Sequence, residues 1–71
     1  MISYAKLFAL LGYKKMNRTE LGKLAGISTA TLSKLNKNEV VTTDTLNKIC
    51  KALNCKIEDI VEYIEDNKEA E

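Results

Sequence analysis

The feature that most constrains this chain is Gly26, which separates two short amphipathic segments that each carry a helix-start signal. The first segment begins at Asn17, which forms a capping-box pattern with Glu20. The second begins at Ser28, a favoured N-cap residue only two positions beyond the glycine. Glycine readily adopts the left-handed conformation that ends one helix and redirects the chain. The sequence therefore predicts two short helices joined by a tight turn, which is the helix-turn-helix arrangement.

Three other segments repeat apolar residues at helical spacing, at about residues 4–14, 43–54 and 57–64. In the last of these, Ile57, Ile60, Val61 and Ile64 predict a fifth helix. Proline is absent from the 71 residues, which also favours helices. We expect an all-α fold of five short helices, with residues 1–66 as a single domain and residues 67–71 as an acidic, frayed tail.

The net charge of +1 conceals an uneven distribution along the chain. Residues 1–38 hold seven Lys or Arg residues and one acid, whereas residues 39–71 hold four Lys residues and nine acids. The N-terminal half is therefore suited to a polyanion, and the C-terminal half repels one. No apolar run is long enough for a membrane span, and the start of the chain lacks a secretory pattern, so we expect a cytoplasmic protein without a membrane partner.

The two cysteines, Cys50 and Cys55, do not predict a metal site, because zinc needs about four ligands and the chain has no histidine. They are interpreted as small apolar core residues, with a redox pair or a disulfide as the alternatives. The absence of histidine and of a glycine-rich phosphate loop also argues against an enzyme. No cofactor and no small-molecule ligand are expected.

The segment NRTELGKLAGISTATLSKLNKNE resembles the helix-turn-helix of the Cro and lambda-repressor-like (XRE-type) family. Its inward apolar positions and its two small-residue positions, Gly22 and Gly26, match the family pattern. The later segment TLNKICKALNCKIEDIVEY resembles the fourth and fifth helices of the same family, and the similarity covers about residues 3–64. The resemblance implies a lambda-repressor-like fold in a bacterial or phage transcriptional regulator that binds double-stranded DNA.

On the family pattern, the third helix (about residues 29–35) lies in the major groove, and its outward positions contact bases. Lys34 can donate to guanine, Thr29 can bond a base edge, and Ala30 can meet a thymine methyl group. The family often has a long amide where Ala30 stands, so readout here relies on short side chains. The expected base-contacting residues are Thr29, Ala30, Ser33 and Lys34.

Phosphate contacts are expected from residues at the ends of the two helices. The start of the second helix attracts an anion through its exposed amides and dipole. The expected phosphate-contacting residues are Asn17, Arg18, Lys37 and Asn38, with Thr42 and Thr43 as weaker candidates. Each neutralised phosphate releases counterions, so we expect binding that weakens steeply with salt.

Two further points concern partners. A homodimer is expected on the family pattern, with Val61, Tyr63 and Ile64 or Val40 and Val41 as candidate surfaces. The alternative function is a protein-binding module, antitoxin-like or adaptor-like, that uses the same fold with little affinity for DNA.

Overall fold

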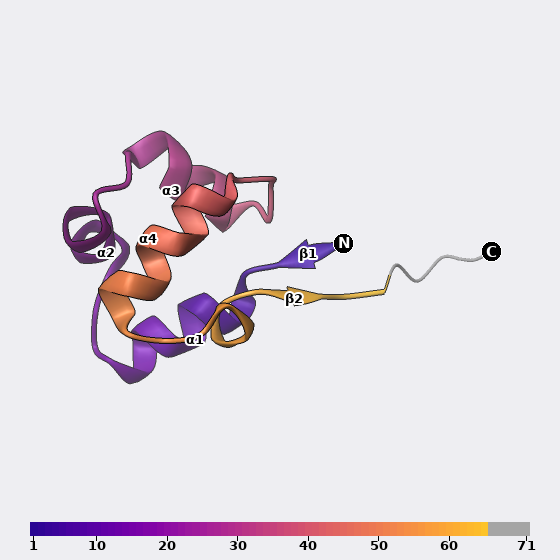
Figure 1. The fold of residues 1–71 in the computed structure, drawn as a ribbon, viewed down its shortest axis with the longest axis horizontal. Coiled ribbons are helices and arrows are strands. Elements are labelled where there is room, and N and C mark those ends of the chain that lie inside the picture. The colour runs from indigo at the N-terminus through magenta and orange to yellow at the C-terminus, as the bar shows by residue number, and fades with distance from the viewer. Residues whose placement is uncertain (66–71) are drawn as a thin grey trace.

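The computed structural model describes residues 1–65, which form a four-helix body and a short two-stranded arm (Figure 1). The body consists of α1 (Ala5–Tyr13), α2 (Arg18–Ala25), α3 (Thr29–Asn36) and α4 (Thr43–Leu53), followed by the 3-10 helix η1 (Ile57–Asp59). The strands are β1 (Ile2–Ser3) and β2 (Glu62–Tyr63). We refer to residues 1–3 and 61–65 together as the arm. The predicted all-α class is confirmed, and the predicted tail at 67–71 lies outside the described residues.

The core is small and draws side chains from each of the four α-helices and from Ile60, which follows η1. Its fully buried members are Leu7, Leu21, Leu35, Ile49 and Ile60. Burying side chains of this size is the main favourable contribution to folding. Within residues 1–65, the structure contains no helix long and apolar enough to cross a membrane.

Helix starts follow the capping signals in the sequence. Asn17 and Glu20 form the predicted capping box at α2, since each side chain accepts a bond from the backbone N–H of the other residue (2.8 and 2.9 Å). Ser28 caps α3 and Thr42 caps α4, each accepting from the backbone N–H three residues further on. The boundaries of these three helices are therefore fixed by local bonds.

Gly26 and Gly22 set the geometry of the pair formed by α2 and α3. Gly26 has a φ of 72°, in the left-handed region that other residues rarely adopt. A Cβ on Gly22 would lie 2.9 Å from Leu32 Cδ1 and 3.3 Å from the Ile27 carbonyl oxygen. The close approach of the two helices therefore favours a small residue at position 22, as predicted.

The predicted fifth helix is wrong, because the described residues contain four α-helices and the chain leaves the helical conformation after Asp59. Ile60 has a φ of −124° and fills the core, and the following residues pair with β1 as an antiparallel strand. The β-branched residues Val61 and Ile64 flank this strand on either side, and such residues favour extended backbone when a partner strand is available. The apolar spacing could not distinguish these outcomes, because the partner strand lies at the other end of the chain.

Candidate nucleic-acid interface

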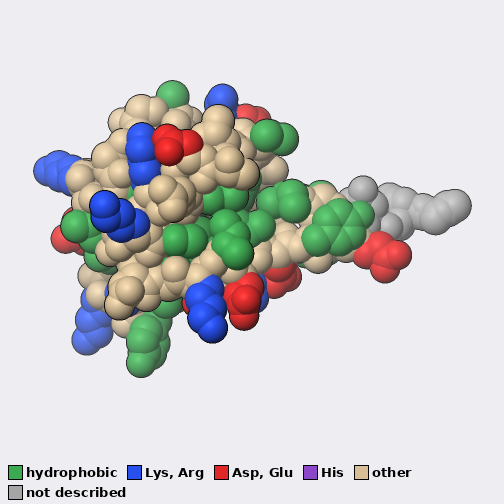
Figure 2. All heavy atoms as spheres, viewed as in Figure 1, with side chains coloured by type: hydrophobic (Ala, Val, Ile, Leu, Met, Phe, Trp, Pro, Cys, Tyr) green, Lys and Arg blue, Asp and Glu red, His purple; other side chains and the backbone are tan. Residues whose placement is uncertain are grey.

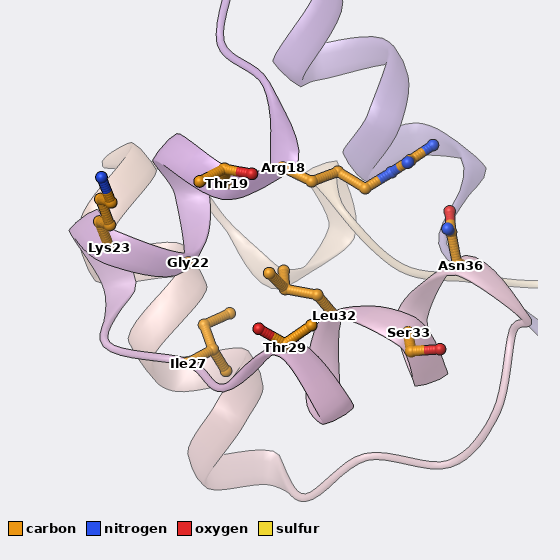
Figure 3. A pocket seen from close by; sticks show the side chains of 9 residues that line it. All are labelled: Arg18, Thr19, Gly22, Lys23, Ile27, Thr29, Leu32, Ser33 and Asn36. Atoms are coloured by element: carbon orange, nitrogen blue, oxygen red, sulfur yellow. The ribbon is translucent and has the colours of Figure 1, made fainter.

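A hollow of about 450 Å³ lies between α2 and α3 and is open to solvent (Figure 3). Its floor is apolar, from Ile27 and Leu32, and its rim is polar or basic. The residues that line it are Arg18, Thr19, Gly22, Lys23, Ile27, Thr29, Leu32, Ser33 and Asn36. The rim residues come from the exposed faces of both helices, which is the side that a helix-turn-helix pair presents to a ligand.

The structure places all four predicted base-contacting residues on the exposed surface of α3. Thr29 and Ser33 are one turn apart and line the hollow between α2 and α3. Lys34 borders a second hollow, on the side of α3 that faces the α3–α4 loop and the start of α4. The four residues thus cover more than one face of a short helix, with the lysine on the side away from α2.

Asn17 and Arg18 lie together at the start of α2, as predicted, but they have different surroundings. The Asn17 Oδ1 accepts the cap bond from the Glu20 backbone N–H. Its amide nitrogen is therefore the part of the side chain suited to donate to a phosphate. The Arg18 guanidinium lies over the ring of Phe8 in α1, with its Cζ 5.2 Å from the ring centroid.

Lys37 and Asn38 follow α3, and Asn38 also has a structural role. Asn38 adopts a left-handed φ of 57°, and its Oδ1 accepts a bond from the Tyr4 backbone N–H at 3.0 Å. The Tyr4 hydroxyl donates to the Glu39 carbonyl oxygen at 2.8 Å, and burial raises the pKa of this phenol. The loop after α3 is therefore fixed to the start of α1. The exposed Lys37 side chain lies beside this fixed point.

The charges around the site favour an anion. Glu20, which caps α2, is the sole acidic residue among residues 1–38. Figure 2 shows the basic side chains spread over the helical body, where some acidic side chains also lie, whereas the arm carries acidic side chains. An anionic ligand would therefore approach the helical body rather than the arm.

Sequence reasoning did not select three residues that share the hollow with Arg18: Thr19, Lys23 and Asn36. Thr19 and Lys23 are four residues apart in α2, and Asn36 lies two turns after Thr29 in α3. Helical spacing from the selected residues would have found them, because positions one turn apart share a face. Lys23 adds a positive charge to the rim, and Thr19 and Asn36 add two hydrogen-bonding groups.

The cysteines lie away from this surface, at the end of α4. Both Cys50 and Cys55 are free thiols and are half-buried. Burial and the neighbouring Cys50 thiol raise the pKa of Cys55. The predicted interpretation as core residues fits these positions. Within residues 1–65 no group of His, Cys, Asp and Glu side chains is arranged to hold a metal ion.

Two short helices hinged at a left-handed glycine, with a polar and basic outer face, define a helix-turn-helix DNA-binding domain. The chain belongs to the Cro/C1-type helix-turn-helix DNA-binding domain family, which matches residues 6–66. It is 44% identical over 59 residues to YozG of Bacillus subtilis (strain 168), an uncharacterised HTH-type transcriptional regulator, and the match covers 80% of this chain and 70% of YozG.

The fold also agrees with a solved structure. The crystal structure of the transcriptional regulator VanUg (form II) is similar with a TM-score of 0.87 and 42% identity, over 92% of this chain and 87% of VanUg. The resemblance derived from the sequence is therefore confirmed. The chain carries a DNA-binding helix-turn-helix domain of the type found in transcriptional regulators.

Proposed function

We propose that this protein is a sequence-specific transcriptional regulator that places α3 in the major groove of double-stranded DNA. The observation that carries the proposal is the outward face of α3. Thr29, Ala30, Ser33 and Lys34 are all exposed, and the hydrogen bonds of the described residues do not occupy the Thr29, Ser33 or Lys34 side chains. A helix in this position reads base edges through its outward side chains.

The readout rests on short side chains and one long one. Lys34 can donate to guanine O6 or N7, Thr29 can bond a base edge, and Ala30 can contact a thymine methyl group. Short side chains reach a base when the helix axis lies deep in the groove. Contacts at both ends of the helix pair would hold the helix at this depth.

Those contacts are proposed for Asn17 and Arg18 at the start of α2, and for Lys37 and Asn38 after α3. The first pair lies where the helix dipole favours an anion. The second pair belongs to a loop that Tyr4 holds in place. Phosphate contacts at two separate points fix the register and orientation of a protein on the duplex.

We also propose that the protein acts as a homodimer on DNA. A single α3 has eight residues and covers only a short stretch of major groove, whereas dimers in this class read two half-sites about one helical turn apart. Among the predicted dimer surfaces, Val40, Tyr63 and Ile64 are exposed in the monomer. If the protein binds as a homodimer, selection of bound duplexes should give a palindromic consensus sequence.

The test is selection of bound sequences from a random duplex pool, followed by a salt series on the selected duplex. A defined consensus, with binding that weakens steeply as salt rises, is the expected result. The competing function is a protein-binding module. The exposed apolar and acidic side chains of the arm favour this alternative. Such a module would show no affinity for any duplex even at low salt.

A further inference from the structure

Arg18 is held in place by an aromatic ring on a neighbouring helix. Its guanidinium carbon lies 5.2 Å from the centroid of the Phe8 ring, within the range of a cation–π contact. Phe8 is half-buried in α1 and packs against the core, whereas Arg18 is exposed at the first position of α2. A fixed group therefore orients a long side chain that would otherwise move freely in solvent.

The ring takes the place that a carboxylate often has. Among residues 1–65, Arg18 forms no ion pair with a carboxylate, and the ion pair of Lys48 with Asp44 lies within α4. Glu20, the acid nearest to Arg18 in sequence, bonds to the Asn17 backbone. A carboxylate would occupy the N–H donors of the guanidinium and cancel its charge, but a ring contacts only the flat face of the group. The donors around the edge and the positive charge both remain available.

The position of the guanidinium suits an anionic ligand. Arg18 lines the hollow between α2 and α3, and it also lines another hollow, between α1 and the start of α2, together with Phe8 and Asn17. Figure 3 shows its side chain extending from the start of α2 toward the side of the hollow where Asn36 lies. The charge therefore stands at the rim of the surface that we assign to DNA.

We propose that Phe8 is a positioning residue for DNA binding, whose ring holds the Arg18 guanidinium with its N–H edge toward a backbone phosphate. The inference rests on the proposed function, because it needs DNA on this surface. It adds a residue of α1, outside the helix-turn-helix, to the binding apparatus. Phe8 itself contacts Arg18 and the core.

The test is a double-mutant cycle on affinity for a short fluorescein-labelled duplex, with Phe8→Leu and Arg18→Gln alone and together. Phe8→Leu is expected to weaken binding roughly two- to fivefold in the parent protein and to have no further effect when Arg18 is already Gln. Arg18→Gln should lower the slope of log affinity against log salt by about one. Phe8→Tyr keeps the ring and should restore parent affinity.

Controls separate positioning from a general loss of structure. Tyr13→Leu removes another aromatic ring of α1, 86% exposed, and should leave affinity unchanged. Thermal unfolding of each variant shows whether Phe8→Leu acts through stability, which would weaken binding equally in both Arg18 backgrounds. Equal loss in both backgrounds, or no loss, overturns the role of Phe8. A parent protein that binds no duplex at low salt overturns the proposed function as well.

Discussion

The α2–α3 unit and the arm are held together in opposite ways. In the α2–α3 unit, hydrogen bonds join residues close in sequence, such as the Ser28 cap of α3 and the bond from the Ile27 N–H to the Gly22 carbonyl oxygen at 2.9 Å. In the arm, the bonds join residues 63 positions apart, because the Met1 amino group donates to the Ile64 carbonyl oxygen at 2.6 Å and the Ile64 N–H donates back to Met1.

This difference indicates how the two regions depend on the rest of the molecule. The α2–α3 unit contains its own start, turn and stop signals, so its shape is specified within about twenty residues. The arm exists only when the body has brought both strands together, because loop closure over that separation has an entropic cost. The proposed DNA surface therefore lies on a region whose shape is specified by nearby residues. The arm, in contrast, depends on the tertiary structure of the body.

The largest expected effect is on the free energy of unfolding, and it tests whether Ile60, which leads into the arm, belongs to the core. Leu21→Ala and Ile60→Ala should each lower the free energy of unfolding by about 2–5 kcal/mol, because both side chains are completely buried. Leu24→Ala is the matched control on an exposed position, where a change within about 0.5 kcal/mol is expected. Urea denaturation gives all three values. A loss at Ile60 as small as that at Leu24 would show that this segment is dispensable.

The second test asks whether DNA binding is confined to the helical pair. Lys34→Ala should weaken binding to the selected duplex by about 1–3 kcal/mol and relax preference at one base pair. Lys56→Ala removes an exposed lysine just before η1 and should leave the affinity unchanged. Fluorescence anisotropy on selected and scrambled duplexes measures both. Equal loss on every sequence would reassign Lys34 to a phosphate.

The third test concerns the hinge of the helical pair. Gly26→Val should cost about 1–2 kcal/mol of stability, because the residue has a φ of 72°. Gly12→Ala is the contrasting change, since a Cβ there would meet no atom within 4 Å, and alanine in a helix should add about 0.5–1 kcal/mol. Thermal or urea unfolding compares the two variants. Equal stability of the Gly26 variant and the parent would contradict a strained turn.

The smallest expected effect is in the arm. Ile64→Pro removes the N–H that donates to Met1 and should cost about 0.5–1.5 kcal/mol of stability, with no change in DNA affinity. In an antiparallel pair, bonded and non-bonded residues alternate, so the N–H of Tyr63 faces away from β1. Tyr63→Pro is therefore a control with a smaller backbone effect. Reduced DNA affinity in the Ile64 variant would connect the arm to the binding surface.

The parts of the fold that the sequence predicts are those with local signals. The capping box at Asn17, the caps at Ser28 and Thr42 and the glycine turn were all predictable, because each depends on residues within one helical turn. The strand at Glu62–Tyr63 was not, because its pairing partner is β1 at the opposite end of the chain. Helical spacing of apolar residues was a misleading signal there.

The candidate site divides in the same way. Exposure of Thr29, Ala30, Ser33 and Lys34 followed from helical periodicity on a correctly placed α3. The contact of Arg18 with Phe8 and the bond from Tyr4 to Asn38 could not be predicted, since each joins two different elements. Knowledge of the three-dimensional packing is needed to see that α1 supports both ends of the surface assigned to DNA.

The four outward side chains of α3 make no hydrogen bond that the described fold depends on. Their chemistry can therefore change without disturbing the core, the caps or the hinge. A library of variants at positions 29, 30, 33 and 34 should consist mainly of folded proteins, so selecting it for altered operator preference would test the proposed base contacts directly. This separation makes the domain a suitable starting point for engineering regulators with new target sequences.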